Sequence, residues 1–271
     1  MSSLSLPEAV ARYAPDGTRV YLGNFGAQLF CVGHELIRQG RRELDVVIAS
    51  GGLLLDQLFG AGLVRTATFG HCWSPVGPAP AWNFRRLAQS GAAAGRLHEL
   101  PLGWLTAALA AGAQQLPFMA VPDLPGTGYV TEDWPGGRTQ VVATRFGSAR
   151  VISAEVPDVA FVHADLADVA GNATIRGPLG ETVLATQAAR ATVVVAEEVV
   201  PTAQVLAAGV TIPGLLVDAV VARPGAVRPD GAVGRYDRDV AAYRDYSAAS
   251  RTVGGFQQWL RTEVLEQQDS R

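Results

Sequence analysis

Short apolar segments that end in glycine recur along the first 70 residues, and each is followed by a polar loop or a stretch with helical spacing. The three segments are Thr18–Leu22, Leu44–Ala49 and Val64–Phe69. Leu44–Ala49 is a nearly uninterrupted apolar run, which is typical of a parallel strand that is covered on both faces. The alternation of the three segments with helical stretches predicts an α/β fold, with an open, mostly parallel sheet and flanking helices. The outline is Rossmann-like, but no dinucleotide motif accompanies it.

The rest of the chain continues the alternation, with more loop between the elements. We expect helices at Leu102–Gln114 and Val183–Arg190, and strands at Phe118–Val121, Val159–Ala164, Ala191–Ala196 and Leu216–Ala222. Residues Glu132–Ser148 read as a β-ribbon around Gly136-Gly137, and Asp239–Glu266 reads as helical with a break at Gly254-Gly255. Because no linker or low-complexity tract divides the chain, we predict one domain over residues 1–271.

Composition excludes several classes of partner. A net charge of −3 gives no basic footprint for nucleic acid. The longest apolar run, Trp104–Gly112, is too short to span a bilayer, and Met1–Leu6 lacks the pattern of a signal peptide. The two cysteines allow no disulfide framework. We therefore expect a soluble, cytoplasmic protein with no membrane partner.

The glycines at the strand ends mark the candidate ligand-binding edge of the sheet. In open α/β sheets, ligands bind beyond the carboxyl ends of the strands, where loops and helix N-termini converge. Glycine lets the backbone approach a ligand closely, and its N–H can hold an anion or a carbonyl oxygen. Neither G-x-G-x-x-G after a strand nor G-x-x-x-x-G-K-[ST] occurs, so a nucleotide is not indicated.

Two other chemistries fit the sequence less well. Cys31, His34, His71 and Cys72 include enough sulfur and imidazole ligands for zinc, but Cys31 stands among apolar helix residues, where a small apolar side chain belongs. Cys72 with His71 is a poor nucleophilic pair, because adjacent residues on an extended segment point in opposite directions. We predict no metal site and no nucleophile in this chain.

Buried polar residues near the ends of the later strands are the remaining candidates. Glu197 and Glu198 close an apolar strand, where a desolvated carboxylate would have a raised pKa. We favour a structural role, in which one of the two caps the strand or pairs with an arginine. His163 is interpreted as a hydrogen-bonded core histidine, and Asp218 as structural.

Taken in order, these segments resemble the α subunits of class I CoA-transferases. The resemblance is closest to the glutaconate CoA-transferase A-subunit branch, which includes the A subunits of steroid ring-opening hydrolases. The matching pieces are Val20–Gly26, Glu35–Gly40 with Leu44 and Gly51-Gly52, Gly62–Arg65, Leu116–Phe118 with Gly126–Gly128, Val156–Ala164 with Gly171-Asn172, Ala196–Val200 and Val217–Val221. Each piece alone is weak, but their order and spacing together are specific.

The resemblance implies a division of labour between two subunits. In this family the acyl-CoA thioester is attacked by a glutamate of the β-type partner, and the α subunit supplies backbone donors for the oxyanion and walls for the acyl group. Coenzyme A is then a substrate and no cofactor is needed, and the partner is a β-type subunit in an αβ or α2β2 assembly. The family match places substrate contacts at Gly23, Asn24, Phe25, Gly26, Gly51, Gly52, His71, Ser74, Gly126, Thr127 and Gly128.

Departures from the family pattern bear on the substrate. Relatives often carry a cation just after the first glycine turn, where this chain has Gln28-Leu29-Phe30, and the loop around Trp73 is rich in proline. A larger, less charged acyl group than a short dicarboxylate is therefore expected. Two alternatives stay open: the A subunit of a ring-opening acyl-CoA hydrolase of the cholesterol-degrading type, and a non-catalytic acyl-CoA-binding subunit.

Overall fold

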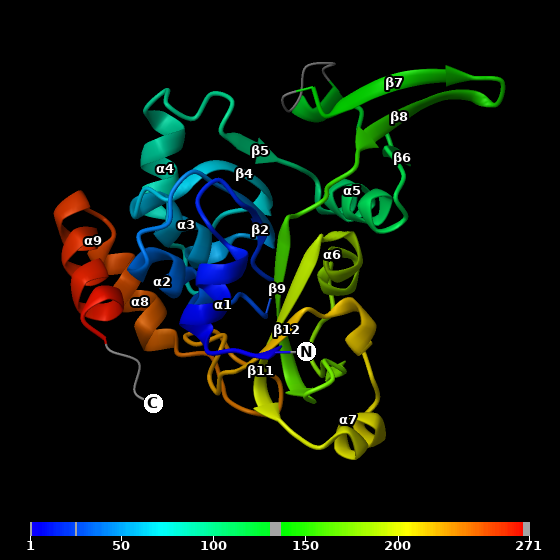
Figure 1. Ribbon diagram of the computed structural model, residues 1–271. Helices are drawn as coiled ribbons and strands as arrows, with labels where there is room; N and C mark the ends of the chain where they lie inside the picture. Colours follow the sequence, from blue (N-terminus) through cyan, green and yellow to red (C-terminus); the bar gives the residue numbers. More distant parts are fainter. Residues whose placement is uncertain (1, 25, 131–136, 268–271) are drawn as a thin grey trace.

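The computed structural model describes residues 2–24, 26–130 and 137–267, and one large sheet organises this part of the chain (Figure 1). Its strands run in the order β1 (Ser2–Ser3), β12 (Ala219–Ala222), β11 (Ala191–Val199), β9 (Val159–Ala167), β2 (Arg19–Tyr21), β3 (Leu44–Ser50), β4 (Val64–His71) and β5 (Leu97–Glu99). All neighbours in this order are parallel, and only the short β10 (Ala173–Thr174) pairs antiparallel with β9. The predicted open, mostly parallel sheet is confirmed.

Helices cover both faces of this sheet. One face carries α1 (Leu6–Tyr13), α2 (Phe30–Arg38), α3 (Gly52–Gly60), α4 (Trp82–Gln89), α8 (Val240–Ala249) and α9 (Val253–Leu260), which a π-helical turn (Arg261–Leu265) extends. The other face carries α5 (Leu102–Ala113), α6 (Thr182–Ala188) and α7 (Thr202–Ala208). Short 3-10 turns occur at Gly128–Val130 and Gly214–Leu216. None of the helices in the described residues combines the length and apolar character that crossing a membrane requires.

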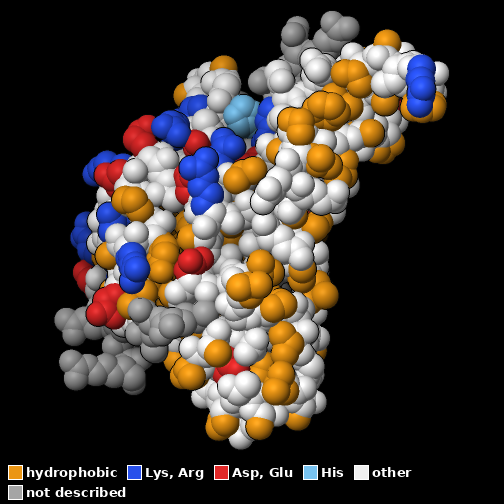
Figure 2. Space-filling view, turned by 45° about the vertical axis from the view of Figure 1, so that its right-hand side comes forward, with side chains coloured by type: hydrophobic (Ala, Val, Ile, Leu, Met, Phe, Trp, Pro, Cys, Tyr) orange, Lys and Arg blue, Asp and Glu red, His pale blue; other side chains and the backbone are white. Residues whose placement is uncertain are grey.

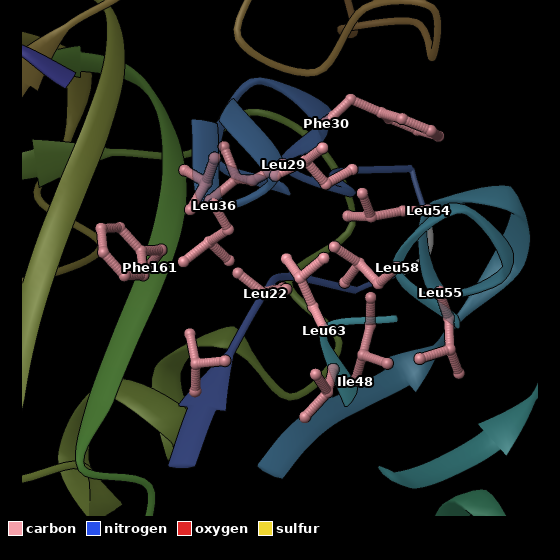
Figure 3. Close-up of a cluster of buried hydrophobic side chains, with 14 of the residues drawn as sticks. Leu22, Leu29, Phe30, Leu36, Ile48, Leu54, Leu55, Leu58, Leu63 and Phe161 are labelled. Atoms are coloured by element: carbon pink, nitrogen blue, oxygen red, sulfur yellow. The ribbon is translucent and has the colours of Figure 1, made fainter. Parts of the chain in front are cut away.

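The larger core lies between the sheet and the layer formed by α1, α2, α3, α8 and α9. Figure 3 shows Leu36 of α2 and Leu58 of α3 packed against strand residues such as Ile48 and Phe161. All four side chains are fully buried, and burying each contributes about 1.5–3 kcal/mol relative to exposure. A second core lies beneath α5 and α6 on the opposite face of the sheet. The sheet is thus covered on both sides, which explains why the buried positions of its central strands are mainly apolar.

Several elements differ from the predicted ones. Sequence reasoning missed α1, α4, α7 and β5. The strand expected at Ala191–Ala196 continues to Val199, so Glu197 and Glu198 lie inside β11 and do not close it. The strand expected at Leu216–Ala222 begins only at Ala219, because the preceding residues form a 3-10 turn. The prediction of one domain over residues 1–271 remains a prediction.

A small antiparallel sheet projects from the body as an arm. It contains β6 (Phe118–Val121), β8 (Gly147–Ser153) and β7 (Thr139–Thr144), in that order (Figure 1). The ribbon was predicted around Gly136-Gly137, but its two strands are joined at Arg145 and Phe146. Residues 132–136 of the predicted ribbon lie outside the described residues.

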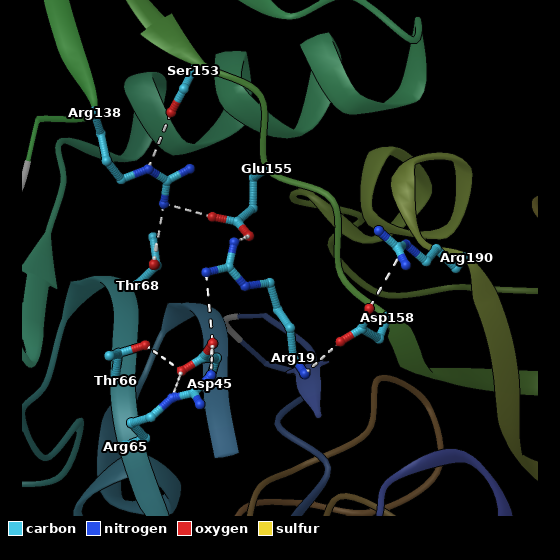
Figure 4. Close-up of polar contacts among 10 residues, drawn as sticks. All are labelled: Arg19, Asp45, Arg65, Thr66, Thr68, Arg138, Ser153, Glu155, Asp158 and Arg190. Atoms are coloured by element: carbon cyan, nitrogen blue, oxygen red, sulfur yellow. Dashed lines mark hydrogen bonds and ion pairs between the residues drawn. The ribbon is translucent and has the colours of Figure 1, made fainter. Parts of the chain in front are cut away.

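A buried carboxylate ties the arm to the large sheet. Glu155 accepts from Arg19 of β2 at 3.0 Å and from Arg138 beside β7 at 2.6 Å (Figure 4). Arg138 also donates to Thr68 of β4 at 3.2 Å. Charge-assisted hydrogen bonds to a buried group are stronger than neutral ones, so this cluster fixes how the arm leaves the body.

The expected helix break at Gly254-Gly255 is displaced. α8 ends at Ala249 and α9 begins at Val253, so both glycines lie in the first turn of α9. The Thr252 hydroxyl caps this turn by accepting from the Gly255 N–H at 3.0 Å. A Cβ at Gly255 would collide with the Ala249 carbonyl, so this glycine allows the two helices to meet closely.

Candidate functional site

The loops after β2, β3 and β4 share one edge of the large sheet. The strands are parallel and adjacent, with Val20 paired to Val46 and Ser50 paired to His71. Their carboxyl ends therefore lie side by side, and the three glycine loops leave from the same place. This edge is the candidate functional site.

The first loop is a tight glycine turn. Gly23 has φ +90°, and a Cβ there would collide with the Ala27 carbonyl, so only glycine fits. The turn closes with a bond from the Ala27 N–H to the Asn24 carbonyl at 3.1 Å. The Asn24 side chain is buried and donates to the Leu179 carbonyl at 2.5 Å. Gly26, at φ +76°, completes the turn, and Phe25, a predicted contact, lies outside the described residues.

Gln28 connects the first loop to the second. Its buried amide donates to the Ser50 carbonyl at 2.5 Å, at the end of β3. Gly52 has φ +51°, and a Cβ there would collide with the same Gln28 amide. Gly51, the other predicted residue of this loop, donates its N–H to the His71 carbonyl at 2.9 Å. The three loops are therefore in direct contact.

His71 brings in the third loop. Its Nε2 lies 3.3 Å from the Ser50 hydroxyl, and its ring packs beside Trp73 with 5.4 Å between centroids. Burial lowers the pKa of His71, so the ring is neutral at pH 7. Neutral imidazole can donate or accept one hydrogen bond at the edge, but it brings no charge there.

Cys72 is not activated as a nucleophile. Its thiol donates to the Gly52 carbonyl at 3.4 Å, and burial raises the pKa of Cys72 well above its usual value. A thiol with a raised pKa stays protonated and unreactive at neutral pH. Cys72 therefore serves to hold the second and third loops together.

Ser74 and the later glycine loop are the remaining predicted contacts. The Ser74 hydroxyl is buried and is engaged with Val76, donating to its carbonyl at 3.1 Å and accepting from its N–H at 3.2 Å. Gly126, Thr127 and Gly128 are exposed, in the turn after β6. The ring of Tyr129 reaches back toward the edge, with its hydroxyl 3.5 Å from the Glu99 carboxylate of β5.

A buried carboxylate network occupies the same edge at β9 and β11. Glu197 interacts with His163 Nε2 at 3.1 Å and accepts from the Tyr236 hydroxyl at 2.5 Å and from the Gly225 N–H at 2.6 Å. Burial alone would raise the pKa of Glu197, but these hydrogen bonds outweigh it and hold the pKa below its usual value. The carboxylate is ionised and saturated with donors, so it anchors the segment that carries Gly225 and Tyr236.

The structural interpretations of the polar strand residues agree with these contacts. His163 is a hydrogen-bonded core histidine, and Glu198 pairs with Arg235 at 3.8 Å. Asp218 accepts from the Thr192 N–H at 2.8 Å, which joins β11 to the residue before β12. A desolvated carboxylate at this position was expected to have a raised pKa. The pKa of Glu197 is instead lowered, because its hydrogen-bond donors outweigh the effect of burial.

Arginines from a distant segment stand beside the first glycine turn. A hollow of about 500 Å3 lies between Gly26 and residues 230–238. In it, Arg235 Nε donates to the Asp165 carboxylate at 3.3 Å, and Arg235 Nη2 donates to the Asp165 backbone carbonyl at 2.7 Å. Arg238 Nε donates to the Asp230 carboxylate at 2.7 Å. Each guanidinium is paired with a carboxylate, so the hollow is polar but has no excess of positive charge.

The residues weighed as zinc ligands are separately engaged. His34 Nε2 bonds Gln57 at 2.9 Å, while His71 and Cys72 make the contacts described above. Within the described ranges there is no group of three or more His, Cys, Asp or Glu side chains placed to hold a metal ion.

A model of the family described as coenzyme A transferase matches residues 4–223. The chain belongs to the coenzyme A transferase family. It is 30% identical over 263 residues to the A subunit of 3-oxoadipate CoA-transferase from Pseudomonas knackmussii, covering 95% of this chain and 91% of the relative. It is 30% identical over 229 residues to the cholesterol ring-cleaving hydrolase IpdA subunit of Mycobacterium tuberculosis, covering 80% and 77%. Glutaconate CoA-transferase from Acidaminococcus fermentans has the same fold, with a TM-score of 0.88 at 24% identity, covering 99% of this chain and 90% of that chain.

These matches confirm the sequence-based identification as an α-type CoA-transferase subunit. Within this CoA-transferase chain, the structure brings Gly23, Asn24 and Gly26 close to Gly51, Gly52 and His71 at one edge. Next to the loop of Gly126–Gly128, Tyr129 reaches Glu99 at the end of β5. The substrate-contact roles of all these residues remain predictions.

Sequence reasoning missed the partners that hold the CoA-transferase edge together. Gln28 was noted for the charge it lacks, whereas its amide joins two loops. Tyr236 and Arg235 reach the edge from more than 30 residues beyond β11. Contacts of such long range leave no mark on local spacing, so only the folded chain reveals them.

Proposed function

We propose that this chain is the α-type half of a heteromeric CoA-transferase that moves CoA between an acyl-CoA and a carboxylate. A β-type subunit completes the site, as αβ or α2β2. The observation that carries the proposal is that the carboxyl edge of the sheet is formed by glycine loops, and that three candidate nucleophiles there are protonated or held in hydrogen bonds. Cys72 is protonated, the Ser74 hydroxyl is engaged within its own loop, and Glu197 is held by its donors. Such an edge suits binding and polarising a thioester that another chain attacks.

The reaction divides between the two chains. A glutamate of the β-type chain attacks the thioester carbonyl and expels CoA thiolate, which leaves an acyl-glutamyl anhydride. The thiolate then attacks the glutamyl carbonyl of the anhydride, which releases the first carboxylate and leaves a glutamyl-CoA thioester. The acceptor carboxylate attacks this thioester, and the same two steps in reverse give the new acyl-CoA and restore the glutamate. CoA is a substrate, and we propose no resident cofactor. Covalent catalysis of this kind replaces one difficult transfer by two easier ones.

We propose that the first glycine turn stabilises the charge that develops on the thioester oxygen. Among the described residues, the backbone N–H groups of Asn24 and Gly26 donate to no other group. Backbone donors that are fixed in advance favour an oxyanion without reorganisation, and one such donor is worth about 3–4 kcal/mol in the transition state. Gly23 fixes the geometry of the turn, since no side chain fits there.

A larger, weakly charged acyl group fits the walls of the site. The exposed ring of Trp73 lies beside His71, and Leu102 lies against Gly70 at the same edge. The nearby arginines are already paired with carboxylates, so an anionic acyl tail would gain little there. This supports an extended apolar acyl chain or ring in preference to a short dicarboxylate.

The test is CoA exchange by the assembled complex. The chain is co-expressed with the β-type CoA-transferase chain of its own organism, and acyl-CoA is incubated with a panel of isotope-labelled carboxylic acids. Mass spectrometry should detect labelled acyl-CoA only with both chains present and with the partner's glutamate intact. Turnover by the isolated chain, or none by the complex with any thioester, would overturn the proposal. The partners we propose exclude nucleic acid and membranes, and the compartment we propose is the cytoplasm.

The 30% identity to the IpdA subunit favours one second candidate, an acyl-CoA ring-opening hydrolase. The same assay separates the two reactions. A hydrolase consumes acyl-CoA without any acceptor acid and puts solvent oxygen into the product, whereas a transferase requires the acceptor. Binding of acyl-CoA with neither reaction would indicate the non-catalytic subunit.

A further inference from the structure

The two helical layers of the molecule differ sharply in charge. Every helix on the α1 face contains a charged residue except α9, and α9 leads directly into Arg261 and Glu263. On the opposite face, α5, α6, α7 and the 3-10 turn at Gly214–Leu216 contain no Asp, Glu, Lys or Arg. Two long stretches of sequence on this side, Leu102–Pro122 and Val199–Val217, are likewise without charge.

We call the outer surface of α5, α6, α7 and the β6–β8 sheet the uncharged face, after its helices; beside them it carries two exposed arginines, Arg145 at the tip of the arm and Arg190 two residues after α6. Figure 2 shows apolar side chains gathered down the right-hand side of the molecule, where these elements lie, and charged side chains concentrated on the left. The large apolar side chains exposed on these elements or next to them in sequence include Leu102, Leu116, Phe118, Val141, Phe146, Val156, Leu206 and Leu215. Phe146, at the tip of the arm, is 85% exposed.

The centre of this face is hollowed. Leu116, Pro117 and Val156 line a hollow of about 520 Å3 together with Gln187–Ala189 at the end of α6. The surface of a soluble chain ordinarily carries about 25–35% charged residues, and large apolar patches mark interaction sites. An apolar surface with a central hollow and a protruding arm suits a protein partner.

The uncharged face runs directly into the candidate site. Leu102, at the start of α5, packs against Gly70 at the end of β4. The carbonyl of Leu179, just before α6, accepts from the Asn24 side chain of the first glycine turn at 2.5 Å. A body seated on α5 and α6 therefore reaches the carboxyl edge past two carboxylates, Glu99 just before α5 and Glu181 just before α6.

We propose that the β-type subunit docks on the uncharged face, with the β7–β8 arm along its flank. This inference rests on the proposed function, since it names where the chain that supplies the nucleophile sits. A second copy of this chain fits less well, because it would bring another edge without an available nucleophile. Docking here covers the apolar surface and delivers the partner's glutamate to the first glycine turn.

Matched charge insertions test the docking surface. Val156→Asp and Leu116→Asp place a carboxylate at the central hollow, whereas Val253→Asp makes the same kind of change at a 60% exposed position on α9. Binding of the purified β-type chain is measured by titration calorimetry. We expect the two face variants to bind about 30-fold or more weakly, since charge at an interface core is poorly tolerated, and the control to bind as wild type.

A measurement on the unaltered chains guards against variants that misfold. Hydrogen exchange of wild type with and without the β-type chain should show protection in α5 and α6 and none in α9. Protection of α8 and α9 alone, with full CoA exchange, would overturn the docking surface and leave the proposed function intact. Self-association of the isolated chain through α5 and α6 that the β-type chain does not displace would assign the face to a second copy. Absence of both binding and turnover would instead overturn the proposed function.

Discussion

Gly52→Ala tests whether the glycine loops of the site are held by the contacts described above. Gly52 has φ +51°, a left-handed conformation that costs an alanine about 1–2 kcal/mol. Its new Cβ would also collide with the Gln28 amide, which donates to the Ser50 carbonyl. Displacing this buried amide loses one hydrogen bond and leaves Ser50 without its donor, at a cost of about 1–3 kcal/mol. The expected total is about 2–5 kcal/mol of the free energy of unfolding.

Two controls separate backbone strain from collision. Gly40→Ala has the same strain, at φ +63°, but a Cβ there meets nothing within 4 Å, so we expect a loss of only about 1–2 kcal/mol. Gln28→Ala removes the group that would be struck. In that background Gly52→Ala should cost little more than the strain, which gives a coupling of about 1–3 kcal/mol in a double-mutant cycle.

Urea unfolding followed by circular dichroism gives all four free energies of the cycle. Additive losses, or a Gly52→Ala loss no greater than that of Gly40→Ala, would show that Gln28 does not pack against this glycine. In the assembled complex, Gly52→Ala should also slow CoA exchange, because the displaced amide lies between the first and second loops.

Three further outcomes follow from buried charge and protonation. Burial lowers the pKa of His34 to about 4 from its usual 6.5, so the unfolded chain binds the proton first and stability falls as pH drops from about 6.5 to 4. Because the ring is partly exposed, we expect wild type to lose about 1–2 kcal/mol of unfolding free energy over that range. Urea unfolding across the range should show this loss in wild type and not in His34→Gln. Glu197→Gln should lower the free energy of unfolding at pH 7 by about 3 kcal/mol. As pH falls below 4.5, through the lowered pKa of Glu197, wild type should lose its stability advantage over the variant. An equal difference between wild type and variant at pH 7 and pH 3 in calorimetric scans would contradict this expectation. Arg138→Ala should speed hydrogen exchange in β7 and β8, because it leaves Glu155 with one partner, whereas Arg145→Ala at the tip of the arm should not.

Strand prediction succeeded where local pattern determines the structure. The run at Leu44–Ala49 is mainly apolar because both faces of the sheet are covered, and the glycines that follow it and Val64–Phe69 mark the edge correctly. The same reasoning missed α1, although Ser5 and Glu8 form a capping box that a search for helix starts would have found. It also misplaced the turn of the arm, because Gly136-Gly137 has stronger turn propensity than Arg145-Phe146.

The site itself was only partly accessible to sequence reasoning. The glycines could be placed at one edge, because parallel strands align their carboxyl ends. The bond from Gln28 to Ser50, and the bonds of Glu197 to His163, Tyr236 and the N–H groups of Gly225 and Ala226, join residues between 22 and 39 positions apart. Tertiary packing creates these contacts, and neither periodicity nor motif spacing encodes them. The ionised state of Glu197 likewise depends on donors that only the fold brings together.

The absence of charge on α5, α6 and α7 also affects how the subunit is produced in the cell. A chain synthesised in excess of its partner exposes this surface to the crowded interior, where apolar patches associate indiscriminately and attract chaperones and proteases. Balanced synthesis of the two subunits, and pairing soon after folding, would cover this surface before it associates with other proteins. Heterologous production of this chain by itself should accordingly give aggregates at concentrations where the co-expressed pair stays in solution.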